Sequence, residues 1–174
     1  MAILECGCPE HYPSEWDGKD IDLSGQCVHA QSIPAFFLMP INHTGHRMRQ
    51  SASIEALELE EEWPGFTLTK TTMFGGEILR LINNSDSPSR LIKHLPIDFN
   101  VRCAIHEGEM KTLGNTSRKL QQALFDDGKL PKELYLSHIT CPRCAGDRGG
   151  DKILLLRRWQ ASPTLQRRID KQKA

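Results

Sequence analysis

Residues 133–159 read ELYLSHIT, then CPRC, then AGDRGGD, then KILLLRRW. The first and last segments are apolar and of strand length, and the stretch after CPRC contains three glycines that let the backbone reverse. This pattern predicts two β-strands joined by a loop that carries Cys141 and Cys144. Thiols two residues apart in such a tight turn lie on one side of it and can bind one metal ion.

A second pair of metal-binding side chains precedes this hairpin, at Cys103 and His106. A structural zinc ion usually takes four sulfur or nitrogen ligands, supplied as two closely spaced pairs. We therefore predict a zinc-ribbon or treble-clef-like site in which Cys103, His106, Cys141 and Cys144 are the ligands. The prediction requires a strand that ends near Arg102, because residues three apart in one extended strand lie on opposite faces.

A third group of such residues lies near the N-terminus and leaves two alternatives open. Its members are Cys6, Cys8, His11 and Cys27. In the first alternative, Cys6, Cys8 or His11 forms a second, separate site with Cys27. In the other, the N-terminal pair completes the knuckle at residues 141–144, and Cys103 is a core residue.

Zinc is the metal that these residues favour. Mixed thiolate and imidazole ligands suit zinc, whereas iron–sulfur clusters usually take thiolates alone. A closed site with four protein ligands leaves no position for a substrate water, and its binding energy goes into folding. We therefore expect a structural zinc ion and name no catalytic residue.

The remaining chain mixes helical and extended patterns, which predicts an α+β fold with no regular βαβ alternation. Expected helices span residues 47–62, 73–82, 87–94, 115–125 and a basic segment after Ser162, and expected strands span residues 66–71 and 97–103. We divide the chain into an N-terminal α+β part, residues 1–95, and a zinc-knuckle part with a basic C-terminal helix, residues 96–174. The two parts are expected to form one compact unit.

The charge of the chain is zero in sum but unevenly distributed. Residues 1–62 hold eleven acids and three bases, a net charge of −8, while residues 143–174 hold nine bases and three acids, a net charge of +6. No apolar run approaches the roughly 18 residues of a membrane span, and the N-terminus lacks the pattern of a secretory signal. Six cysteines in such a chain more often bind metal than form disulfides, which predicts a cytoplasmic protein with no membrane partner.

The basic end predicts contact with nucleic acid, because arginines neutralise phosphates. The candidate residues are Arg143, Arg148, Arg157, Arg158, Arg167 and Arg168. Our first hypothesis is a zinc-stabilised binding module associated with nucleic acid, or a subunit of a nucleoprotein complex. The alternative is a zinc-stabilised accessory subunit of a protein-only assembly, with other protein subunits as its partners.

A thiol-redox or zinc-dependent enzyme is the second alternative. The four residues from Cys141 to Cys144 resemble the Cys-Pro-x-Cys active site of glutaredoxins. In that family the motif opens a helix, whose N-terminus lowers the pKa of the thiol. Here a glycine-rich stretch, residues 145–151, follows the motif where that family has a helix.

Overall fold

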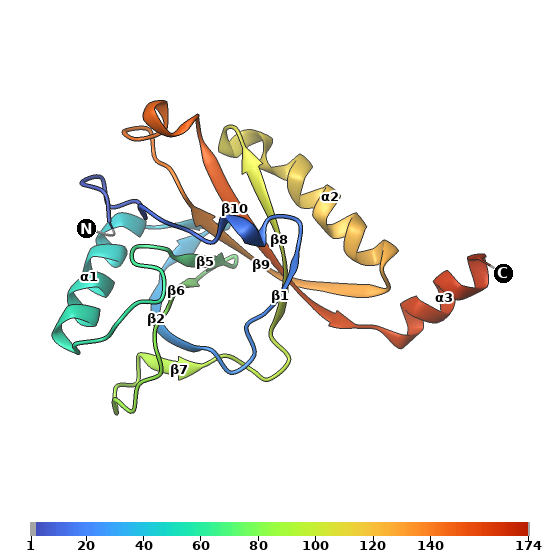
Figure 1. Ribbon diagram of the computed structural model, residues 1–174, viewed down its shortest axis with the longest axis horizontal. Helices are drawn as coiled ribbons and strands as arrows, with labels where there is room; N and C mark the ends of the chain where they lie inside the picture. The colour runs from blue at the N-terminus through green and yellow to red at the C-terminus, as the bar shows by residue number, and fades with distance from the viewer. Residues whose placement is uncertain (1–2, 174) are drawn as a thin grey trace.

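The computed structural model describes residues 3–173 and contains one curled antiparallel sheet flanked by helices (Figure 1). The strand order is β1-β8-β10-β9-β5-β6-β2-β7. These strands are β1 (Asp20–Asp22), β2 (Cys27–Ile33), β5 (Leu68–Thr71), β6 (Gly76–Leu81), β7 (Ile92–His94), β8 (Asn100–Glu107), β9 (Lys129–His138) and β10 (Lys152–Ala161). The helices are α1 (His43–Ala56), α2 (Leu113–Asp126) and α3 (Pro163–Lys173). The expected mixed α/β class is confirmed.

Strands from the two parts of the chain occupy the two halves of this sheet. Strands β5, β6, β2 and β7 lie together, as do β8, β10 and β9, and the halves meet where Thr69 of β5 pairs with Leu136 of β9. Strand β1 crosses over to pair with β8. The boundary proposed at residue 95 therefore falls between β7 and β8, within a continuous sheet.

Both long helices cover the same face of the sheet. Leu113 and Leu120 of α2 pack on the strands beside Leu136, and His43 of α1 is hydrogen bonded to Thr69, the residue directly opposite Leu136. Directly opposed residues of antiparallel strands point to the same face. Helix α3 instead extends from the end of β10, away from the sheet (Figure 1).

The opposite face of the sheet holds the larger apolar core. It buries Phe66, Leu68, Val101, Tyr135 and Leu154, among others, under the N-terminal segment that carries Trp16. Trp16 and Phe66 meet edge to face, with ring centroids 6.2 Å apart. Because both faces are covered there, residues 153–156 of β10 are apolar and buried without alternation.

The hairpin of β3 (Ala35–Phe36) and β4 (Met39–Pro40) stands out from this architecture. Its turn residues Phe37 and Leu38 have φ values of 47° and 68°, in the left-handed region where large side chains are strained. All residues from Phe36 to Met39 are exposed. The hairpin therefore exposes apolar side chains to solvent, and the left-handed backbone at Phe37 and Leu38 costs free energy.

Two helix predictions were wrong, because each of these segments contains a strand and no helix. Within residues 73–82, Gly76–Leu81 form β6, where Ile78, Leu79, Arg80 and Leu81 are all buried, so the apolar residues do not alternate. A short apolar run buried on both faces resembles a helix by periodicity alone. Residues 87–94 end in the short strand β7.

None of the helices in residues 3–173 has the length and apolarity that a membrane crossing requires.

Candidate metal centre

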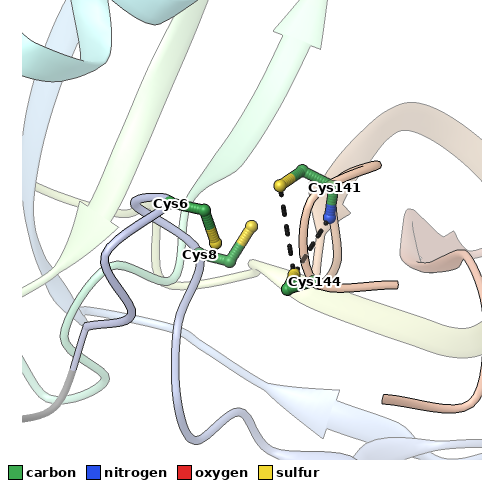
Figure 2. Close-up of side chains that lie close together, drawn as sticks. All are labelled: Cys6, Cys8, Cys141 and Cys144. Atoms are coloured by element: carbon green, nitrogen blue, oxygen red, sulfur yellow. Dashed lines mark hydrogen bonds between the residues drawn. The ribbon is translucent and has the colours of Figure 1, made fainter. Parts of the chain in front are cut away.

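Four cysteines from opposite ends of the chain meet at one point. The sulfur atoms of Cys6, Cys8, Cys141 and Cys144 all lie within 4.8 Å of one another (Figure 2). Those of Cys141 and Cys144 are 3.9 Å apart. Zinc–sulfur bonds of about 2.3 Å in a tetrahedron place the sulfurs roughly 3.8 Å from one another. The cluster therefore has the dimensions of a four-thiolate metal site.

The loop between β9 and β10 positions the C-terminal pair. The backbone N–H groups of Cys144 and Ala145 both donate to the Cys141 carbonyl, at 3.0 and 2.9 Å, which closes a tight turn. The N–H of Cys141 points at the Cys144 sulfur, at 3.4 Å. Backbone donors aimed at a sulfur stabilise its thiolate form, which is the form that binds metal.

A small turn in the N-terminal loop positions the other pair. The Gly7 N–H donates to Leu4 and the Leu4 N–H donates to Cys8, at 2.7 and 2.9 Å. Gly7, with φ at 83°, supplies the left-handed residue that the turn needs. Cys6 and Cys8 consequently point together toward the knuckle, and Cys8 is only 2% exposed.

Two guanidinium groups secure these loops. Arg148 donates to the carbonyls of Pro9, Glu10 and Ile139 at 2.9–3.2 Å and so ties the N-terminal loop to the hairpin loop. Arg47 of α1 donates to the Gly7 carbonyl at 2.7 Å. Both cations lie beside a cluster that becomes negative when its thiols ionise. The sequence interpretation missed Arg47, because no local pattern links it to residue 7.

The protonation of the thiols differs across the cluster. Burial, together with hydrogen bonds from the neighbouring thiols, holds the pKa of Cys8 well above its usual range. Partial burial also raises the pKa of Cys141, but the N–H groups of Arg143 and Cys144 outweigh this effect and lower it to about 7. Cys141 therefore ionises more readily than Cys8.

Cys103 and His106, the first pair of zinc ligands expected from the sequence, lie outside the four-cysteine cluster. Strand β8 continues unbroken through Cys103 and His106, so the turn that their pairing requires is absent and they face opposite sides. Cys103 is fully buried in the apolar core. His106 is hydrogen bonded to Thr116 and Thr112 under α2, at 2.8 and 3.1 Å.

The two other candidate ligands near the N-terminus also lie outside the cluster. His11 is exposed in the loop that follows Cys8, and Cys27 is buried at the start of β2. The structure thus assembles the N-terminal pair with the 141–144 knuckle, one of the two alternatives that the sequence left open.

The six arginines named for nucleic acid do not form one surface. Arg157 reaches α2, where it contacts Ser117 and Gln121, and burial lowers its pKa. Arg158 lies on the opposite face, paired with Asp98 at 3.1 Å and stacked on an aromatic ring. The Arg148 guanidinium is hydrogen bonded to backbone carbonyls of the N-terminal loop and the hairpin loop. Only Arg143, Arg167 and Arg168 have exposed side chains.

A family model described as "Bacterial hydrolase" matches residues 3–158. The chain belongs to this family of bacterial hydrolases. The family's matched region includes all four clustered cysteines and ends before α3. No curated protein matches the chain.

The fold of this family member is similar to that of a protein named EcmrR. A crystal structure of the EcmrR C-terminal domain superposes with a TM-score of 0.54 and 17% identity, over 82% of this chain and 95% of that domain. EcmrR in a cryo-EM structure of an EcmrR–DNA complex superposes with a TM-score of 0.57 and 16% identity, over 82% of this chain and 56% of that one. This chain therefore shares the fold of the EcmrR C-terminal domain and spans little more than half of the DNA-bound protein.

Proposed function

We propose that Cys6, Cys8, Cys141 and Cys144 hold one structural zinc ion. The supporting observation is the mutual spacing of the four sulfurs, which suits a tetrahedral ion. In this arrangement the β9–β10 loop is a zinc knuckle of the ribbon type, and the N-terminal turn supplies its partner. Four thiolates complete the coordination and exclude a metal-bound water, so the ion stabilises the fold and takes no part in catalysis.

The metal content of the purified protein tests this assignment. Element analysis is expected to give one equivalent of zinc per chain, because Cys27 and Cys103 lie outside the cluster. Two equivalents would mean a second site. Iron in place of zinc would contradict the identity of the metal, since four thiolates also suit iron.

We infer further that the chain serves a nucleoprotein complex as a binding domain. The observation that supports this function is the fold it shares with the C-terminal domain of a protein found in a DNA complex. The dispersed arginines favour attachment through protein contacts over direct reading of DNA bases. A protein-only assembly remains the alternative, and the same experiment separates the two.

A gel-shift titration at two salt concentrations provides that experiment. If only Arg143, Arg167 and Arg168 reach phosphates, the log–log salt slope for duplex DNA is expected to be about −2 to −3. Substitution of all three by glutamine should remove the salt-dependent component, whereas substitution of the inward-facing Arg157 should not. Binding that is absent at low salt would favour the protein-only assembly.

Hydrolysis is a second function, supported by membership of the bacterial hydrolase family. The cysteine cluster is unsuited to it, because a metal saturated by thiolates cannot activate water. A hydrolytic centre must therefore use other residues of the chain.

A further inference from the structure

A surface cavity of about 590 Å³ opens at the edge of the sheet, beside the start of β2 and the end of β7. Its lining includes Cys27, Asn84 and His94, three residue types that together can perform nucleophilic catalysis. Cys27 does not belong to the metal cluster, so its thiol is unused by the function described above.

The register of β2 and β7 places Cys27 directly opposite His94. Hydrogen bonds from Leu95 to Gln26 and from Ala30 to Leu91 flank this pair, at 2.9 and 2.7 Å, and mark it as a non-hydrogen-bonded pair. In such pairs the side chains approach most closely, with Cβ atoms roughly 4.5–5.5 Å apart on one face of the sheet. The thiol and the imidazole are thus held as cross-strand neighbours.

The imidazole of His94 is oriented by Asn84. Nε2 of His94 lies 3.3 Å from Oδ1 of Asn84, an oxygen that can only accept. Nε2 therefore carries the proton, and Nδ1 has a free lone pair. Within residues 3–173, Nδ1 has no hydrogen-bond partner, so it is available to accept a proton.

The Cys27 side chain is buried at the start of β2. The residue is 4% exposed and lies in the wall of the cavity. No hydrogen bond joins its sulfur to the imidazole in the described chain. The cross-strand register keeps the two side chains on one face, and catalytic contacts often tighten only when substrate binds.

We propose that Cys27, His94 and Asn84 form a thiol-dependent acyl-hydrolysis site, with Cys27 as nucleophile, His94 as general base and Asn84 as positioning residue. This inference rests on the hydrolytic function proposed above and is independent of the zinc assignment. The same combination of thiol, imidazole and amide occurs on unrelated folds, because the chemistry depends on geometry and not on the scaffold.

The reaction proceeds in two balanced steps. The Cys27 proton passes to Nδ1 of His94, the sulfur forms a bond to the acyl carbon, and the bond to the leaving group breaks as the imidazolium protonates it. A water then attacks the thioester while His94 accepts its proton, and the carbon–sulfur bond breaks. The departing thiolate recovers the proton, so an ester or amide and water give an acid and an alcohol or amine.

The cavity walls indicate the class of substrate. Gln26, Glu62 and Asn83 line the cavity with amide and carboxylate groups, and the Gln26 amide donates to Glu62 at 3.1 Å. Such walls favour a small polar acyl group over a long hydrocarbon chain. We therefore assign small polar esters or amides as the substrate class.

Acylation of the zinc-loaded full chain by 4-nitrophenyl acetate tests the site. We expect a burst of about one equivalent of nitrophenolate per chain and an acetyl group on Cys27 in the peptide map. The Cys27→Ser variant should lose both signals. An acetyl group on another residue would leave hydrolysis standing but overturn this site, and the absence of any acyl-enzyme would remove thiol-dependent hydrolysis.

Two further variants separate catalysis from folding. His94 is exposed, so His94→Gln should unfold at the same temperature as the unchanged chain while its acylation slows about 10²–10⁴-fold. Asn84→Ala should displace the pH profile of acylation, which a merely structural role would not do. His11→Gln, a change in an exposed histidine elsewhere, is the matched control. Equal rates in His94→Gln and His11→Gln would overturn the proposal.

Discussion

Replacement of Cys144 by alanine is expected to lower bound zinc from one equivalent per chain to nearly none. The three remaining thiols cannot complete a tetrahedral site, and the N-terminal loop loses its link to the hairpin loop. Loss of a structural metal belongs to the few single changes that cost about 4 kcal/mol or more. For a chain of this size the melting temperature should fall by about 10 °C. Element analysis and calorimetry measure the two effects.

The matched control is Cys27→Ala, which removes a buried thiol outside the cluster. This variant should retain one equivalent of zinc and melt at a higher temperature than Cys144→Ala. A Cys144→Ala protein with full metal content and an unchanged melting curve would refute the zinc assignment. Treatment of the unchanged chain with a strong chelator should reproduce the loss seen in Cys144→Ala.

Replacement of Arg80 by methionine is expected to reduce the free energy of unfolding by about 3–5 kcal/mol. The Arg80 side chain is 2% exposed and meets Glu61, itself 9% exposed, at 2.7 Å. It also donates to Gln50 and Ser51 of α1 at 3.2 and 2.7 Å, so it fastens that helix to β6. Without the guanidinium, the Glu61 carboxylate is left buried and unpaired. Urea unfolding measures the loss.

An exposed ion pair provides the contrast for this measurement. Lys111 and Glu109 lie 2.6 Å apart, but their side chains are 74% and 63% exposed. Because water screens such a pair, Lys111→Met should leave the unfolding curve almost unchanged. Addition of Glu61→Gln to Arg80→Met should recover part of the stability, since no buried charge then remains. Equal losses in the Lys111 and Arg80 variants would contradict the proposed role of burial.

The sequence was informative where local patterns decide the structure. The helices expected at residues 115–125 and after Ser162 correspond to α2 and α3. The strands around the cysteine loop are β9 and β10. Segment 73–82 was misread because tertiary burial of both faces of β6, which no local pattern records, removes the alternation of an ordinary strand.

In the metal site, too, the part formed by a local turn could be predicted from the sequence, and the part formed by distant residues could not. The knuckle of Cys141 and Cys144 is a local turn and can be recognised from four residues. Its partners Cys6 and Cys8 lie far away along the chain, and only the packed sheet with Arg148 brings them near. Strand β8 continued past the point where the Cys103 hypothesis required a turn, because its pairing with β10 extends to Glu107.

The cysteine cluster also decides how this molecule would respond to mechanical tension. With an ion in place, the polymer between residues 8 and 141 is a closed ring, and a force applied to the two chain ends bypasses it. Stretching would first load the segments outside the ring, and the C-terminal one contains β10, so its pairing with β8 and β9 would carry the tension directly. The other strands of the sheet lie between residues 20 and 138, inside the ring, so they would be extended only after a metal–sulfur bond had ruptured.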